Sequence, residues 1–269
     1  MMFDISKSVG CTERMNYLKR GFLFYMCSSC MLLVQFAIYL VNSNYWESLN
    51  FVGGFYYLMA ALGQAFLFNL IPWVILYIPF TWWRQMQKVG TILFSCAIFL
   101  LNVLAYLNGI VFQLYKFHIN GFVLDLAFGG GGNQVFVFNN TLILHGVLIG
   151  LLILLFTLAV VFIAYRYAWY VTSKQVKIGI YLFLFSCIAP QLTHAYAAAA
   201  NVNSIMEVSA CLPQYYPLTA NRLMLKLGVV KKEDLYVNNP DKGKGHSFVY
   251  PLHPLEKVDS VKPLNIIYL

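Results

Sequence analysis

The sequence predicts an all-α membrane protein with five transmembrane helices and a short C-terminal linker on the far side of the membrane. The first observation is composition: 60% of the 269 residues are hydrophobic and only 10% are charged, whereas soluble domains carry about 25% charged residues. The second is where the charges fall. Asp, Glu, Lys and Arg are absent from residues 21–46, 48–83, 89–115, 126–165 and 178–206. Each stretch exceeds the roughly 20 residues that a helix needs to cross the hydrocarbon core.

This composition excludes several classes of protein. A cytosolic enzyme, a disordered chain and a scaffold stabilised by disulfides would all be more polar, and the strands of a transmembrane β-barrel are only ~10 residues long. The net charge of +8 divides into +6 for residues 1–200 (ten basic, four acidic) and +2 for residues 201–269 (eight basic, six acidic). Neither share forms the basic patch that nucleic-acid binding requires, so no nucleic-acid partner is expected.

Turn residues and aromatic flanks narrow the charge-free stretches to five helices. We expect them near residues 21–42, 54–80, 91–115, 141–165 and 178–199. The first helix starts late and lacks a small-residue cleavage pattern, so it is an anchor and not a signal peptide. The second stretch is long enough for two spans, but the distribution of basic loops favours one.

Basic residues predict the orientation of these helices. Nine lie in the segments on one side, and the loop 116–140 on the other side has only Lys116. The nine are Lys7, Arg14, Lys19, Arg20, Arg84, Lys88, Arg166, Lys174 and Lys177. Because loops rich in Lys and Arg remain in the cytoplasm, the chain is predicted to be N-in and C-out. Residues 1–200 then form the transmembrane domain and residues 201–269 a linker on the opposite side.

Four polar residues fall toward the outer side in this topology. They are His118, Asp125, His145 and His194. Histidines with a carboxylate can bind a metal or perform acid–base chemistry, so one hypothesis is a membrane enzyme that acts on lipid head groups. Their spacing matches no compact motif, however. We therefore expect His118 and Asp125 to be loop residues, and His145 and His194 to be hydrogen-bonded between helix ends, with no metal or cofactor.

Polar amides also occur inside the predicted spans. They are Gln64, Asn69, Asn102, Asn108 and Gln191, and we expect interhelical hydrogen bonds from them. In the loop after the third span, apolar residues between Phe117 and Leu126 recur at helical spacing. They predict a short amphipathic helix that lies on the outer interface.

Residues 215–228 of the linker predict a small helix, with Thr219 as N-cap, Gly228 as C-cap and Arg222 in the first turn. Free backbone N–H groups, the positive end of the helix dipole and a guanidinium together form a physical anion site. The alternative is an ordinary capped helix with a solvated arginine. At the end of the chain, residues 261–269 form an apolar run that predicts the first strand of a further sheet.

Taken together, these segments resemble the N-terminal membrane region of the YejM/PbgA (LapC) family of Gram-negative inner-membrane proteins. The resemblance covers essentially the whole chain. It rests on the five spans and on residues 117–126, 216–222, 250–252 and 264–269. The last of these is similar to the opening strand of the sulfatase-like domain that follows in that family, so the chain is expected to stop before any hydrolase chemistry.

The resemblance implies a non-enzymatic module that binds lipopolysaccharide or cardiolipin at the periplasmic face of the bacterial inner membrane. It further implies regulation of lipopolysaccharide synthesis through a LapB-like partner. The lipid phosphate site of the family has Thr-Ala-Arg-Arg, which corresponds here to Thr219, Ala220, Asn221 and Arg222. One of the two cationic positions is therefore neutral in this chain. A further alternative is a bare anchor for a separately encoded hydrolase domain.

Overall fold

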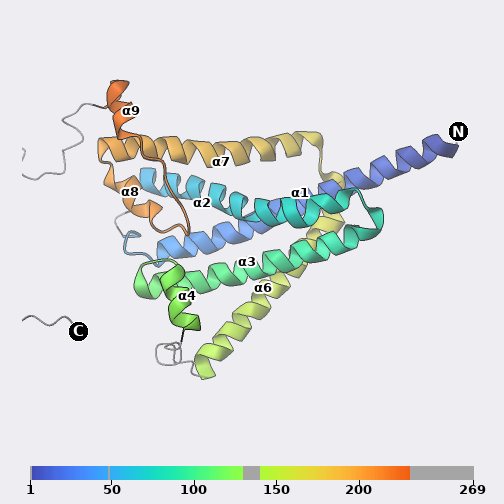
Figure 1. Cartoon of the computed structure of the whole chain (residues 1–269), viewed down its shortest axis with the longest axis horizontal. Coiled ribbons are helices and arrows are strands. Elements are labelled where there is room, and N and C mark those ends of the chain that lie inside the picture. The colour runs from blue at the N-terminus through green and yellow to red at the C-terminus, as the bar shows by residue number, and fades with distance from the viewer. Residues whose placement is uncertain (1, 48, 130–139, 231–269) are drawn as a thin grey trace, which may run out of the picture.

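The computed structural model describes residues 2–47, 49–129 and 140–230. Within this part of the chain, all regular secondary structure is helical. Five helical spans are long and apolar enough to cross a membrane. In Figure 1 the spans within residues 12–41, 51–81, 84–115 and 173–200 run close to the long axis, and the span within residues 143–170 crosses obliquely. The prediction of an all-α membrane protein with five spans is confirmed.

The five spans contain both α-helices and shorter helical turns. In chain order the elements are α1 (Met2–Val41), α2 (Phe51–Pro72), η1 (Trp73–Tyr77), η2 (Ile78–Thr81), η3 (Arg84–Met86), α3 (Gln87–Tyr115), α4 (Gly121–Phe128), α6 (Asn140–Tyr167), η4 (Ala168–Tyr170), α7 (Ser173–Ala200), α8 (Asn203–Ser209) and α9 (Asn221–Lys226). The second stretch forms a single span, Phe51–Thr81, as predicted.

The first helix is longer than the prediction, because α1 begins at Met2 and not near residue 21. Its N-terminal part projects beyond the other helices in Figure 1. The candidate span within it is Thr12–Val41. Charged residues mark where hydrocarbon ends, but helical hydrogen bonding continues past that point because Lys, Arg and Glu are good helix formers.

The helices meet at two ends of the bundle, which we name by their elements. At the α8 end lie α8, α9 and the connection between α1 and α2; at the N-terminal end lie the connections between α2 and α3 and between α6 and α7 (Figure 1). Near the N-terminal end, Pro72 lacks an N–H, and the helix continues from it as the π turn η1. Tyr77 of η1 stacks on Tyr17 of α1 with ring centroids 4.2 Å apart.

α2 packs closely against α1 and α7. The approach to α7 depends on Gly63, because a Cβ atom built there would lie 2.3 Å from the Ser186 carbonyl oxygen. Small residues that let backbones approach are typical of helix pairs in membranes. Buried amides join the other helices: Asn69 donates to Ser29 Oγ at 3.0 Å, and Gln35 donates to Asn102 Oδ1 at 2.7 Å. For Asn69 and Asn102 the predicted interhelical bonds are confirmed.

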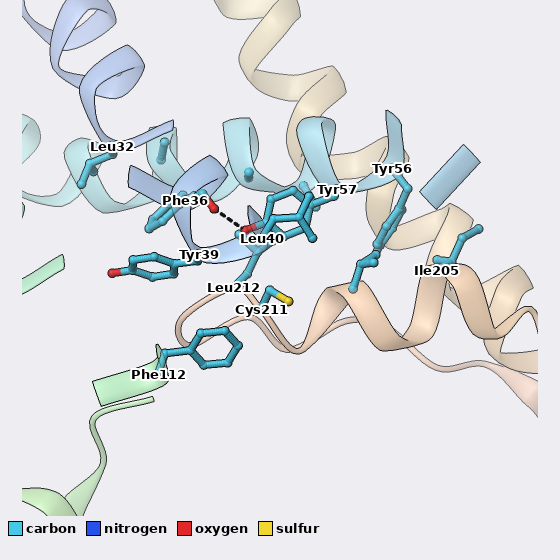
Figure 2. Packing of buried hydrophobic residues seen from close by; sticks show 14 of the residues in the cluster. Leu32, Phe36, Tyr39, Leu40, Tyr56, Tyr57, Phe112, Ile205, Cys211 and Leu212 are labelled. Atoms are coloured by element: carbon cyan, nitrogen blue, oxygen red, sulfur yellow. Dashed lines mark hydrogen bonds between the residues drawn. The ribbon is translucent and has the colours of Figure 1, made fainter. Parts of the chain in front are cut away.

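The larger apolar cluster lies at the α8 end and includes residues that follow the last span. Within this cluster, the Tyr57 hydroxyl of α2 donates to the Phe36 carbonyl oxygen of α1 at 2.7 Å. Figure 2 shows Cys211 and Leu212 entering this cluster from the segment after α8. Both side chains are fully buried. The beginning of the linker is thus packed as part of the helix bundle.

Candidate functional site

Residues 210–218, which we call the docked segment, follow α8 and are fastened to the bundle by hydrogen bonds to their backbone. Gln64 in the middle of α2 donates from Nε2 to the carbonyl oxygens of Pro213 at 3.0 Å and Gln214 at 3.3 Å. Tyr56, also on α2, has its hydroxyl 3.3 Å from that of Tyr215. Buried amides must find such partners to offset their desolvation, which explains a glutamine in a mainly apolar span.

His118 holds the start of the docked segment. Its Nε2 lies 3.1 Å from the Ala210 carbonyl oxygen, and its Nδ1 lies 2.9 Å from Asn108 Nδ2. Asn108 is oriented by the N–H of Ile119, which donates to its Oδ1 at 2.7 Å. The amide nitrogen therefore faces the ring and donates to Nδ1. This arrangement requires the neutral imidazole with its proton on Nε2.

The surroundings of His118 favour the same neutral form. The ring stacks on Phe112 with centroids 4.6 Å apart. Burial lowers the pKa of the His118 imidazole below its usual range, although the bond to the Ala210 carbonyl opposes this shift. A protonated ring would place an N–H on Nδ1 against the amide N–H₂ of Asn108, two donors with no acceptor between them.

This geometry predicts that acid loosens the docked segment. Because the pKa of His118 is lower in the folded than in the unfolded chain, the unfolded chain binds the proton more readily and stability falls as pH drops below about 6.5. A His118→Gln variant keeps a donor and an acceptor but does not titrate. We expect the melting temperature of the wild type to fall relative to this variant between about pH 8 and about pH 5. Parallel curves over this range would contradict the assignment.

His194 holds the other end of the docked segment together with Gln191, one turn earlier on α7. The buried His194 donates from Nδ1 to the Leu218 carbonyl oxygen at 3.0 Å. Gln191 Oε1 accepts from the Leu218 N–H at 2.6 Å. The backbone N–H and the carbonyl oxygen of Leu218 are thus both hydrogen-bonded to side chains of α7. The residues expected to bind phosphate begin at the next position in the chain.

Those four residues lie at the surface beside the end of α7. Thr219, Asn221 and Arg222 are exposed and Ala220 is half-buried. The predicted N-cap is wrong: α9 begins at Asn221, and Ala220 is the N-cap because its carbonyl accepts the first helical bond, from Met224 N at 2.9 Å. At the other end Leu227 is the C-cap, and Gly228 follows it with φ +68°. Since α9 has only six residues, its dipole is small and the Arg222 guanidinium is the stronger source of positive charge at this end of the helix.

The four polar residues that suggested an enzyme lie on different elements. His118 and His194 each bind the backbone of the docked segment, whereas Asp125 on α4 and His145 on α6 are exposed. The expectation that His145 is buried between helix ends is wrong. His194 is buried and hydrogen-bonded as expected, but its partner is the Leu218 carbonyl of the docked segment and not a helix end. No three His, Cys, Asp or Glu side chains approach one another closely enough to bind a metal in the described ranges.

The loop helix predicted from residues 117–126 is present as α4, somewhat later in the chain. Asn120 caps its N-terminus by accepting from Val123 N at 3.1 Å, so Phe117 and Ile119 precede the helix. Phe122 and Phe128 are among the most exposed apolar side chains of the described residues, at 66% and 87%. An interfacial position of α4 stays a prediction.

Comparison with models of known families gives a match over most of the chain. The model of a family described as a domain of unknown function, DUF3413, matches residues 12–257. A search of curated proteins finds no match to the chain. The matched range includes every span, the docked segment and Arg222. Two of the segments on which the YejM/PbgA resemblance rests, 250–252 and 264–269, lie outside the described residues.

Proposed function

This chain belongs to the DUF3413 family, and we propose that it is a membrane module that binds the phosphate group of an anionic lipid through residues 219–222. Binding of the lipid changes the interaction with a partner protein through the helices that hold these residues. The proposal is for a binding module and not for an enzyme. It extends to the N-in, C-out orientation given by the basic residues, which puts residues 219–222 on the periplasmic face.

The observation that carries this proposal is the attachment of the docked segment. Leu218 is hydrogen-bonded through both backbone groups to Gln191 and His194, so Thr219 starts from a fixed position at the end of α7. A binding site that is positioned in advance loses less entropy on binding a ligand. The same bonds connect the site to α7 and, through Gln64, to α2.

Arg222 supplies the charge for phosphate. Its side chain is exposed and, in the part of the chain that the structure describes, it forms no salt bridge. A guanidinium can bind a phosphate with two parallel hydrogen bonds. Asn221 replaces a second cation with an amide, which can still donate a hydrogen bond. We therefore expect weaker binding than a pair of arginines would give.

The resemblance to the YejM/PbgA (LapC) family names the ligand and the partner within this proposal. Lipopolysaccharide or cardiolipin is then the lipid, and the bacterial inner membrane is the location. A LapB-like protein is then the partner, and its binding depends on the conformation of the helices. The outcome for the cell is control of lipopolysaccharide synthesis or of outer-membrane lipid balance.

The test is replacement of Arg222 by alanine, with lipid retention measured by mass spectrometry of the detergent-purified protein. Loss of a charge-assisted interaction of about 1.5–3 kcal/mol should reduce retained lipopolysaccharide about tenfold or more. Lys226→Ala is the matched control, because Lys226 is an exposed cation in the last turn of the same helix. Equal lipid content in the two variants would reject Arg222 as the phosphate ligand.

A further inference from the structure

A cavity whose lining includes two arginines lies at the N-terminal end of the bundle, where α1 meets the end of α6. It has a volume of about 370 Å³ and is lined by Asn16, Arg20, Tyr165, Arg166, Ala168 and Trp169. From its position and charge we propose that it binds the phosphodiester head group of an anionic glycerophospholipid. This proposal does not depend on the function proposed above, which concerns the α8 end.

Among the side chains that the structure describes, basic groups outnumber acidic ones at this end of the bundle. The basic side chains described there are Arg14, Lys19, Arg20, Arg84, Lys88, Arg166, Lys174 and Lys177. Among the described side chains at this end, Glu13 is the only acidic one, and it forms a 2.8 Å salt bridge with Arg84. The two arginines of the cavity therefore have no acidic partner among the described residues. Arg20 is half-buried, whereas Arg166 is exposed. Partly burying Arg20 without a counterion is unfavourable, and an anion from outside would relieve that cost.

Each of the two guanidinium groups lies over an aromatic ring. Arg20, which is half-buried, lies over the Tyr165 ring at 4.8 Å from the centroid, and Arg166 lies over the Tyr167 ring at 5.7 Å. These contacts are within the range of cation–π attraction and leave the N–H edges available to an anion. Arg166 is in the last turn of α6, where the helix dipole offsets part of its charge, whereas Arg20 lies within α1 without such relief.

An adjoining apolar cavity argues that the phosphate belongs to a lipid. Tyr165 also lines a cavity of about 490 Å³ between α3 and α6, whose walls are mainly apolar and include Ile92, Phe99 and Leu158. Lys88 lies among its lining residues and adds a third cation. Tyr165 thus lines both the cationic cavity and the mainly apolar one, an arrangement that fits the head group and an acyl chain of one lipid. Basic pockets between spans are typical sites for anionic head groups.

The experiment compares two double variants that each remove two positive charges from the same end. Arg20→Gln with Arg166→Gln changes the cavity, whereas Lys174→Gln with Lys177→Gln changes exposed lysines of α7 outside it. Binding is measured by native mass spectrometry of protein titrated with phosphatidylglycerol or phosphatidylcholine. All proteins also have Arg222→Ala, so that the site proposed at the α8 end makes no contribution.

We expect phosphatidylglycerol to bind in preference to phosphatidylcholine, and the arginine pair to weaken this binding about tenfold or more while the lysine pair has little effect. Arg166→Gln alone keeps the contact between Arg20 and Tyr165 and should give a partial loss of phosphatidylglycerol binding. This single variant keeps the test valid if the double variant does not fold. Equal losses in both double variants, or equal binding of the two lipids, would overturn the proposal. In a thermal shift assay, inorganic phosphate should not reproduce the stabilisation by phosphatidylglycerol; if it does, the cavity is a site for free phosphate.

Discussion

Replacing Gly63 by alanine is expected to destabilise the bundle strongly, although it adds only a single methyl group. The new Cβ would lie 2.3 Å from the carbonyl oxygen and 2.8 Å from the carbonyl carbon of Ser186. Both are backbone atoms and cannot rotate away, so α2 and α7 must separate. Overpacking of this kind costs about 3 kcal/mol at the upper end of its usual range. Because α7 contains Gln191 and His194, the separation also displaces the docked segment.

Gly150→Ala provides the matched control for this prediction. Gly150 lies within α6, and a Cβ there would meet nothing within 4 Å. Removing a glycine from an open helical position should leave stability unchanged or raise it by about 0.5–1 kcal/mol. The measurement is the melting temperature of each purified variant in the same detergent. Similar melting temperatures for Gly63→Ala and Gly150→Ala would contradict the close packing of α2 on α7.

The second large effect is expected when the docked segment loses its hydrogen bonds to α2 and α7. Gln64→Leu with His194→Phe keeps the approximate volume of both side chains but removes the donors to Pro213, Gln214 and Leu218. Each carbonyl left without a partner costs about 1–3 kcal/mol where it is buried. We expect faster hydrogen–deuterium exchange in peptides from residues 210–219 and a loss of retained anionic lipid, although Arg222 is intact.

Gln175→Leu is the control for this pair. Gln175 also accepts a backbone hydrogen bond, from Thr172 N at 2.8 Å, but at the opposite end of α7. Its replacement should change exchange only around residue 172 and leave lipid retention unchanged. If the double variant loses its hydrogen bonds yet retains lipid as the wild type does, the attachment of the docked segment has no role in binding.

The number of spans follows from the sequence because the absence of charge over more than 20 residues is a local property. The start of α1 does not follow in the same way, since charge marks the edge of the hydrocarbon and not the end of a helix. Thr219 is a good capping residue by type, but the fixed position of Leu218 and the bond from Met224 N to Ala220 place the cap one residue later.

The attachment of the docked segment lies beyond what the sequence predicts. Gln64 and Gln191 inside apolar spans indicate that each has a hydrogen-bond partner, but the partner is 149 residues away for Gln64 and 27 for Gln191. Helix propensity and hydropathy are properties of short windows and contain no information on such pairs. His118 illustrates the same point, because its bond to Ala210 spans 92 residues.

Photo-crosslinking tests most directly whether the docked segment presents a site for an anionic lipid next to Arg222. A photoreactive phenylalanine analogue is placed at the exposed Asn221 or, for comparison, at Tyr181, which is 68% exposed on α7. After illumination in membranes, mass spectrometry identifies the lipid joined to each position. We expect adducts enriched in phosphate-rich anionic lipid at Asn221 and adducts that follow the bulk composition at Tyr181. The same lipid composition at both positions would contradict a lipid site beside Arg222.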